Sequence, residues 1–362
     1  MTDPMLPQAG MKSPDAVKVM VVDDSAFMRF AIAQHLNEHP QIEVVGSAYN
    51  GKEALRLIPA LQPEVITLDV EMPQMDGLAT LRQIMADFPR PVIMFSSLTR
   101  EGAAETIEAL MLGAVDFIAK PDNRLDIRKV MNDMVSKILC AARAKIKTAP
   151  TNRPMSFPDV QTKPLDKQLR AHQKSMPVIL IGSSTGGPGA LNEIIPALPA
   201  TLPSPVLIVQ HMPAGFTRSL SDRLNSISPL KIKEAESGDR LMAGQVLVAP
   251  GGFHMVLDKD ERILLHQKAA VHGVRPAVDV TLTSLVQRFG KNVIAVILTG
   301  MGSDGTHGAS LLHSEGGYVI AEHESTCVVW GMPRSVVEAG AASAILPRPQ
   351  IASALEAVLQ KR

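Results

Sequence analysis

The chain has 362 residues, of which 46% are hydrophobic and 20% charged, and its formal net charge is zero. This length and composition are typical of a globular protein with two cores, and the charge balance argues against a nucleic-acid or membrane surface. No apolar run approaches the roughly 18 residues of a membrane span, and the N-terminus lacks the apolar stretch of a signal peptide, so we expect no membrane insertion.

Cysteine usage points to a reducing compartment. The chain contains only Cys140 and Cys327, which lie in different halves and lack metal-ligand spacing. Both are therefore expected to be reduced thiols in a cytoplasmic protein.

Residues 18–142 alternate short apolar runs with amphipathic stretches, a pattern typical of five βα units. The expected strands are Val19–Val22, Ile42–Gly46, Val65–Leu68, Val92–Phe95 and Val115–Ile118. The expected helices cover residues 26–38, 51–60, 77–88, 101–112 and 123–142. This order predicts one parallel sheet covered on both faces, with ligands at the C-terminal ends of its strands.

Acidic residues gather at these strand ends. Asp23 and Asp24 follow the first strand and Asp69 ends the third, so three carboxylates meet at one edge and require a cation. Oxygen ligands favour a hard ion such as Mg²⁺. Ser96 ends the fourth strand and Lys120 follows the fifth, where a hydroxyl and an ammonium suit the oxygens of a phosphoryl group. Each residue alone has a simpler explanation, as a helix cap or a solvent-exposed lysine, but the ordered set favours a phosphoacceptor.

The set resembles the receiver domain of response regulators, with a flavodoxin-like fold. Two further segments carry the resemblance, Met72-Pro73-x-Met75-Asp76-Gly77 and Gly113-Ala114. The resemblance implies that Asp69 is phosphorylated, that Asp23 and Asp24 help to hold Mg²⁺, that Ser96 is the switch hydroxyl and that Lys120 contacts the phosphoryl group. Phe117 occupies the aromatic switch position, and its role as an ordinary core residue is an equal alternative.

Residues 143–177 break the α/β pattern. They carry several basic residues and little apolar periodicity, together with Pro150, Pro154, Pro158, Pro164 and Pro177. This composition predicts a linker. A solvated tether is favoured over a segment that docks on an acidic surface.

Residues 178–362 return to the α/β pattern and predict a second doubly wound, Rossmann-like domain of three layers. The expected strands are Val178–Ile181, Val206–Gln210, Gln245–Ala249, Val293–Thr299 and Tyr318–Ala321, with a hairpin of Phe253–Leu257 and Ile263–Leu265. The expected helices cover residues 187–197, 277–290, 303–315, 332–339 and 348–361.

The first of these strands ends in Gly182-x-Ser184-x-Gly186, which fits the spacing of a nucleophile elbow. A serine at a strand-to-helix corner among small neighbours is a candidate nucleophile, and its hydroxyl needs a neighbouring base. His211 ends the next strand, at the same predicted edge of the sheet. We therefore favour it as the base over the other histidines of this half, which are His254, His266, His272, His307, His313 and His323.

An orienting carboxylate completes such a site. Asp304 lies in the glycine-rich turn after the strand Val293–Thr299, where it can reach the ring of His211. The alternative is that Asp304 only caps the helix that follows. The order Ser184, His211, Asp304 differs from the serine, acid, histidine order of α/β-hydrolases, which argues against that family.

This half resembles the catalytic domain of the CheB family of chemotaxis protein-glutamate methylesterases. The matching segments are Gly182-Ser183-Ser184-Thr185-Gly186-Gly187, Gln210-His211-Met212-Pro213, Ala249-Pro250-Gly251-Gly252-x-His254-Met255, Arg275-Pro276-x-Val278-Asp279, Leu298-Thr299-Gly300-Met301-Gly302-x-Asp304-Gly305 and Gly331-Met332-Pro333-Arg334. The resemblance implies Ser184 as nucleophile, His211 as base and then acid, and Asp304 as orienting carboxylate. It places Met301 at the edge of the site, and backbone amides near Thr185 and Met301 are candidate oxyanion donors.

The whole pattern implies a receiver domain (18–142), a linker (143–177) and a methylesterase domain (178–362). The expected activity is phosphorylation-controlled hydrolysis of glutamate 5-methyl esters, and deamidation of glutamines, on methyl-accepting chemoreceptors. A CheA-type histidine kinase is the expected phosphate source, and the esterase domain is expected to need no cofactor. Two alternatives stay open: a phosphorylation-controlled binding module without catalysis, and an esterase for a protein outside chemotaxis.

Overall fold

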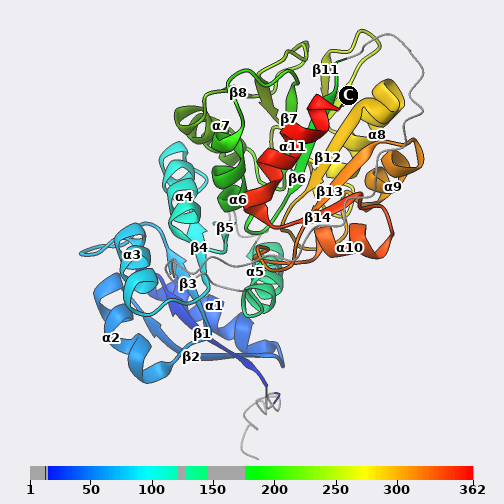
Figure 1. Ribbon diagram of the computed structural model, residues 1–362. Coiled ribbons are helices and arrows are strands. Elements are labelled where there is room, and N and C mark those ends of the chain that lie inside the picture. Colours follow the sequence, from blue (N-terminus) through cyan, green and yellow to red (C-terminus); the bar gives the residue numbers. More distant parts are fainter. Residues whose placement is uncertain (1–12, 14, 121–126, 145–175, 362) are drawn as a thin grey trace, which may run out of the picture. The chain divides into compact units, whose positions relative to one another are not determined.

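A computed structural model of the chain describes residues 13, 15–120, 127–144 and 176–361. Within them the chain forms two compact α/β units, each with its own parallel sheet (Figure 1). The two doubly wound sheets expected from the sequence are therefore confirmed. No helix in the described ranges combines the length and apolar character that a membrane crossing requires.

The first unit contains a five-stranded sheet in the order β2-β1-β3-β4-β5, and all four strand pairs are parallel. Its strands are β1 (Val17–Val22), β2 (Ile42–Ala48), β3 (Val65–Asp69), β4 (Val92–Ser96) and β5 (Asp116–Ala119). The helices that follow these strands along the chain are α1 (Ala26–Glu38), α2 (Gly51–Leu61), α3 (Gly77–Asp87), α4 (Arg100–Leu112) and α5 (Ile127–Ala141). Strands β3 and β4 are buried along their whole length, which explains their continuous apolar sequence.

The direction in which successive strands are added to this sheet reverses at β1, because β2 lies on one side of it and β3 on the other. Ligands of open α/β sheets bind beyond the strand ends at such a point. The first residue of α3, at this point, is Gly77. Glycine is needed because a Cβ at this residue would lie 2.2 Å from the carbonyl oxygen of Asp69. A glycine thus lets a helix start directly against the third strand end.

The second unit contains a seven-stranded parallel sheet in the order β14-β13-β12-β6-β7-β9-β8. Its strands are β6 (Val178–Ser183), β7 (Val206–Gln210), β8 (Lys231–Glu234), β9 (Gln245–Val248), β12 (Val293–Ile297), β13 (Tyr318–Glu322) and β14 (Ala344–Leu346). The antiparallel hairpin β10 (His254–Leu257) and β11 (Ile263–His266) lies outside this sheet, as expected.

Helices cover both faces of this second sheet (Figure 1). They are α6 (Gly187–Ile194), α7 (Phe216–Ile227), α8 (Val278–Phe289), α9 (Thr306–Ser314), α10 (Met332–Glu338) and α11 (Ile351–Gln360). One buried apolar core joins α8, α9 and α10 to alternate residues of the strands, such as Leu180, Leu207 and Ala295. The result is the three-layer arrangement expected for this half.

Three elements escaped the sequence pattern. Helix α7 and the strands β8 and β14 were not predicted, and both strands lie at the edges of their sheet. The helix expected at 303–315 begins only at Thr306, because Gly302 and Gly305 have positive φ angles and form a turn before it. The helix expected at 348–361 splits into a 3₁₀ turn (Arg348–Gln350) and α11. The start of the helix expected at 123, and most of the predicted linker, lie outside the described residues.

Candidate active site and metal centre

The second sheet brings the three predicted site residues to one edge. Its direction reverses between β6 and β12, since the chain first runs from β6 toward β8 and then returns to β12 on the other side. Ser184 follows β6, His211 follows β7 and Asp304 lies in the turn after β12. Ser183 pairs with Gln210 in the β6–β7 register, so Ser184 and His211 each come one residue beyond a paired position.

His211 and Asp304 form a close pair. The distance from His211 Nε2 to Asp304 Oδ2 is 2.7 Å, and their side chains are only 10% and 2% exposed. Asp304 also accepts hydrogen bonds from the backbone N–H groups of Val278, Asp279 and Gly305, at 2.6, 2.9 and 3.0 Å. The carboxylate is therefore held rigidly while it orients the imidazole.

The surroundings of Asp304 favour its charged form. Burial alone would raise the pKa of this carboxyl, but the hydrogen bond and charge of His211, together with the amides of Asp279 and Val278, outweigh burial and lower the pKa. Asp304 is thus a fixed negative charge beside the imidazole at neutral pH.

Asp304 also caps a helix. This helix is chiefly α8, and not α9, which follows Asp304 in the sequence. Val278 and Asp279 are the first residues of α8, so Asp304 satisfies amides at the start of that helix. In return, Asp279 Oδ1 accepts the N–H of Gly308 in α9, at 2.8 Å. This reciprocal capping ties the two helices to the site, and Asp304 serves as cap and imidazole partner at once.

Ser184 occupies a turn that is held by backbone bonds. Its N–H donates to the carbonyl of Thr299 at 3.0 Å, and its own carbonyl accepts from Gly187 at 2.8 Å. A Cβ on Gly300 would lie 2.7 Å from the Cβ of Ser184, so only glycine fits beside it. The positive φ of this turn falls on Gly186, at 77°, whereas Ser184 is not among the described residues with positive φ.

The geometry therefore differs from that of a strained nucleophile elbow, in spite of the matching spacing. Ser184 is partly exposed, and within the described residues its Oγ makes no hydrogen bond. A hydroxyl without a fixed partner is common in ligand-free active sites, where catalytic hydrogen bonds form only with substrate.

A buried ion pair supports the Ser184 turn from behind. Glu322 Oε2 accepts the N–H of Thr299 at 2.8 Å, and Arg348 Nε donates to Glu322 Oε1 at 3.0 Å. The side chains of Arg348 and Glu322 are 5% and 0% exposed. Thr299 thus links this ion pair to Ser184, because its N–H donates to Glu322 and its carbonyl accepts the N–H of Ser184.

The two oxyanion candidates lie in backbone that is well fixed. The Thr185 carbonyl accepts from Thr299 Oγ1 at 2.9 Å. Gly300, next to Met301, donates its N–H to Val329 and accepts from Gly331 and Met332. Within the described residues the Met301 N–H makes no hydrogen bond, so it stays available to an oxygen of a substrate.

Three other histidines of this half lie in the hairpin and in the segment before α8. His254 and His266 pack against each other in the hairpin, with ring centroids 5.4 Å apart, and His272 Nε2 lies 3.0 Å from Asp279 Oδ2. Neither contact includes Ser184. His272 also approaches Asp304, since ligand atoms of His272, Asp279 and Asp304 lie within 4.8 Å of one another. His211 makes the shorter contact to Asp304, a hydrogen bond of 2.7 Å, and it follows the strand paired with that of Ser184.

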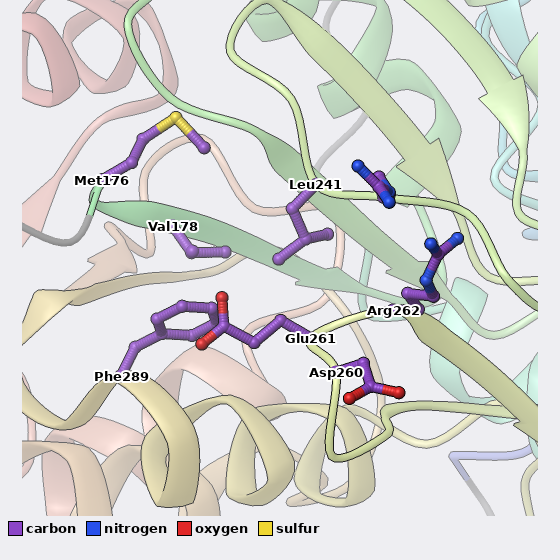
Figure 2. A pocket seen from close by; sticks show the side chains of 8 residues that line it. Met176, Val178, Leu241, Asp260, Glu261, Arg262 and Phe289 are labelled. Atoms are coloured by element: carbon purple, nitrogen blue, oxygen red, sulfur yellow. The ribbon is translucent and has the colours of Figure 1, made fainter.

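A cavity of about 590 Å³ lies away from this site (Figure 2). It is lined by Met176, Val178, Arg240, Leu241, Asp260, Glu261, Arg262 and Phe289. Val178 begins β6, whereas Ser184 follows the end of that strand, so the cavity and Ser184 lie at opposite ends of it. The candidate triad does not line this cavity.

The first unit brings together its predicted phosphoacceptor set. Carboxylate oxygens of Asp23, Asp24 and Asp69 lie within 4.8 Å of one another. Lys120 Nζ lies 2.7 Å from both carboxylate oxygens of Asp69. Asp23 Oδ1 accepts from the N–H of Ser25 at 2.9 Å, but Asp23 Oδ2 is buried and has no hydrogen-bond partner.

A divalent cation fits this cluster. Burial raises the pKa of Asp69 to about 6, with a further rise from the charge of Asp23, even though Lys120 opposes the shift. Burial also raises the pKa of Asp23. The unpartnered oxygen of Asp23 and these raised pKa values both show negative charge that lacks compensation, and three oxygen donors suit Mg²⁺.

The remaining predicted residues flank the cluster. Ser96 is fully buried at the end of β4, and its Oγ lies 3.3 Å from the carbonyl of Ser97. Phe117 is 3% exposed, with Lys137 Nζ 5.4 Å from its ring centroid. Phe117 therefore is a core residue in this structure, which leaves its switch role a prediction.

Several supporting residues were missed in the sequence. Gln210, Asp279, Glu322 and Arg348 have no catalytic signature, although Gln210 and Asp279 lie within segments that carried the family resemblance. For Glu322, the signal available in the sequence was an acidic residue at the end of an apolar strand.

Comparisons with known proteins assign both units of the chain to known families. The sequence model described as CheB methylesterase matches residues 179–355, and that described as response regulator receiver domain matches residues 19–132. A protein-glutamate methylesterase/protein-glutamine glutaminase of Symbiobacterium thermophilum is 51% identical over 94% of this chain and 96% of its own. A relative with the same name from Archaeoglobus fulgidus is 46% identical over 95% of this chain and 98% of its own.

A solved structure gives the same result for the second unit. The crystal structure of the Thermotoga maritima CheB methylesterase catalytic domain is 48% identical, with a TM-score of 0.50, and covers 51% of this chain and 99% of that domain. With near-complete coverage of full-length relatives, the chain belongs to the family of CheB methylesterases that carry a response regulator receiver domain.

Proposed function

We propose that this protein is a serine esterase that hydrolyses glutamate 5-methyl esters on chemoreceptors, under the control of phosphorylation at Asp69. The hydrogen-bonded pair of His211 and Asp304, beside Ser184 at the reversal point of the sheet, is the observation that carries the proposal. The names of the relatives support the same substrate class.

The reaction uses the three residues in sequence. Ser184 Oγ attacks the ester carbonyl while His211 takes its proton, and the carbon–oxygen bond to the methoxy group then breaks as His211 returns the proton and methanol leaves. Water, activated by His211, hydrolyses the acyl-enzyme to glutamate. Amides at Thr185 and Met301 are the proposed donors to the oxyanion.

The nitrogens of His211 have distinct roles in this scheme. Nε2 faces Asp304, so it carries a proton and donates to that carboxylate. Nδ1 then remains to accept the proton of Ser184, and Oγ must turn toward it when substrate binds. Asp304 stabilises the imidazolium that forms, and its lowered pKa keeps it ionised for that purpose.

Deamidation needs no other groups. A glutamine presents the same acyl carbon with an amide leaving group, which departs as ammonia after protonation by His211. The names of the relatives include this glutaminase activity.

The receiver unit is the proposed control element. Asp69 is the acceptor, and Asp23, Asp24 and Asp69 are the residues that would hold Mg²⁺, which neutralises carboxylate and phosphoryl charge when bound. Lys120 and Ser96 are the proposed contacts of the phosphoryl oxygens, which the position of Lys120 Nζ 2.7 Å from Asp69 supports. A CheA-type histidine kinase is the proposed phosphate source, and the cytoplasmic location expected from the free cysteines stays a prediction.

The triad is tested by trapping the nucleophile. The full-length protein is treated with a fluorophosphonate, and the adduct is located by peptide mass spectrometry. The proposal predicts a single adduct on Ser184, which is lost in His211→Ala. An adduct on another serine, or none at all, contradicts the assignment and favours the alternative of a binding module without catalysis.

A further inference from the structure

We propose that Gln210 is a positioning residue that sets the distance between the nucleophile and its base. This inference rests on the proposed role of Ser184. Gln210 is the last residue of β7, directly before His211, and only 2% of it is exposed. It takes no part in the chemistry itself.

The side chain of Gln210 joins both catalytic segments. Its Nε2 donates to the carbonyl of Ser184 at 2.9 Å and to the carbonyl of His211 at 3.2 Å. Its Oε1 accepts the hydroxyl proton of Ser183 at 2.6 Å. One buried amide group therefore spans the ends of β6 and β7 and contacts the backbone of nucleophile and base together.

The orientation of this amide is fixed by its partners. Backbone carbonyls only accept hydrogen bonds, so the two carbonyls must face the NH₂ group. The Ser183 hydroxyl then donates to the oxygen. All polar atoms of the Gln210 side chain are satisfied in this arrangement, as a buried group requires.

The start of α6 is shaped around the same amide. A Cβ on Gly187 would lie 2.0 Å from Gln210 Oε1 and 2.8 Å from Ser183 Oγ. Gly187 also donates its N–H to the Ser184 carbonyl, which thus holds both Gln210 and the first residue of the helix. The absence of a side chain at position 187 makes room for Gln210.

The consequence is a division of labour in the site. Asp304 orients the ring of His211, and Thr299 fixes the amide of Ser184. Gln210 is the side chain, among the described residues, that hydrogen-bonds to the backbone of both Ser184 and His211. A misplacement of about 1 Å can cost about 100-fold in rate, so loss of this link should slow the attack by Ser184 without weakening substrate binding.

The experiment uses two Gln210 variants and one control in the full-length protein. Gln210→Glu keeps the shape but turns a carboxylate oxygen toward the two carbonyls, and Gln210→Met removes all polar atoms. Ser183→Ala is the matched control, because it deletes the hydrogen bond to Oε1 and leaves both Nε2 bonds. Fluorophosphonate labelling of Ser184 is measured as a function of probe concentration and pH, with the melting temperature as a check on folding.

We expect the maximal labelling rate to fall roughly 10- to 100-fold in both Gln210 variants, with half-saturation within about threefold of wild type. Ser183→Ala should keep its maximal labelling rate within about threefold of the wild-type rate, even where its melting temperature falls as much as those of the Gln210 variants. Equal rates in Gln210→Met and Ser183→Ala would overturn the proposal. If even the wild-type protein is not labelled at Ser184, the proposed function itself is wrong.

A measurement on the wild-type protein covers the case in which neither Gln210 variant folds. The side-chain NH₂ protons of Gln210 should exchange with solvent far more slowly than those of exposed Gln360, and their NMR shifts should change when Ser184 is labelled. Exchange as fast as that of Gln360, or shifts that ignore the adduct, would contradict the positioning role.

Discussion

At the scale of single residues, Ser184 and Asp304 differ in how much of the fold depends on them. Ser184→Ala removes a hydroxyl that makes no hydrogen bond in the described structure, so the melting temperature should stay unchanged. Ester hydrolysis should fall by at least about a thousandfold. Activity and thermal unfolding measured on the same sample test both statements.

Asp304→Asn should behave differently. Its NH₂ group would replace one carboxylate oxygen and face either the N–H of Val278 or the N–H groups of Asp279 and Gly305, so the variant should lose thermal stability as well as activity. Calorimetry of the wild type and the two variants is the measurement. A melting temperature of Asp304→Asn equal to that of Ser184→Ala would mean that Asp304 does not act as the cap of α8.

The raised pKa of Asp69, about 6, predicts how its Mg²⁺ site responds to pH. Below this value the carboxyl holds a proton that competes with the cation, and above it the carboxylate is free. Mg²⁺ affinity should therefore rise as pH rises through about 6, with up to tenfold change per pH unit on the acidic side, and binding there should release protons.

Calorimetric titration of the full-length protein in two buffers of different ionisation enthalpy measures this release. Asp69→Asn should weaken both the affinity and its pH dependence, with the remaining dependence due to Asp23, whose pKa is also raised. Mg²⁺ binding that is equally tight on both sides of pH 6 would contradict the assignment of this cluster.

The candidate reactive residues were easier to select from the sequence than the residues that support them. Ser184, His211, Asp304 and Asp69 carry chemistry in their side chains and stand at strand ends, so sequence position and residue type sufficed to select them. Gln210 acts through a side-chain amide whose partners are backbone carbonyls, which no pattern of side chains reveals. The roles of all five residues are predictions, which activity measurements on their variants test.

At the scale of elements, the ion pair between Arg348 and Glu322 links the last part of the chain to β13, which ends at Glu322. Arg348→Met leaves Glu322 buried and unpaired, and loss of one partner of a buried pair costs about 3–5 kcal/mol of unfolding free energy. The matched control is Arg334→Met, since Arg334 and Glu338 form an exposed pair on α10. Denaturant unfolding of both variants is the test, and equal midpoints would rule out a structural role of the buried pair.

The two strands missed in the sequence share a physical cause. Strand β8 reads Lys-Ile-Lys-Glu and has a single apolar residue, as suits an exposed edge, and β14 has only three residues. Central strands such as β6 are buried on both faces and give continuous apolar runs, so they were predicted nearly to the residue. Helix α7 is an exception, because Phe216, Leu220 and Leu224 repeat every four residues and did carry a signal.

At the scale of the whole molecule, the proposed acceptor Asp69 and the candidate triad belong to different sheets. Phosphorylation can control Ser184 only through a change in how the two units interact, a population shift between states of the chain. We predict that acetyl phosphate with Mg²⁺ raises the esterase rate of the full-length protein, and that Asp69→Asn abolishes this rise.

A fragment that begins near Lys174 separates two forms of this control. The β6–β14 sheet is complete within residues 178–346, and the comparable Thermotoga maritima catalytic domain was solved alone, so the fragment should fold. If the unphosphorylated receiver inhibits the esterase, the fragment should be faster than the full-length chain at equal concentration. A slower fragment would mean that the receiver acts by activation.

The boundaries 18–142, 143–177 and 178–362 stay predictions that limited proteolysis can check.

The most direct test of the whole account is the release of methanol from receptor membranes that carry radiolabelled glutamyl methyl esters. The full-length protein is assayed with and without acetyl phosphate, alongside Ser184→Ala. The account predicts release by the wild type, faster with acetyl phosphate, and almost none from Ser184→Ala. Release by Ser184→Ala at the wild-type rate, or none from the phosphorylated wild type, would contradict it.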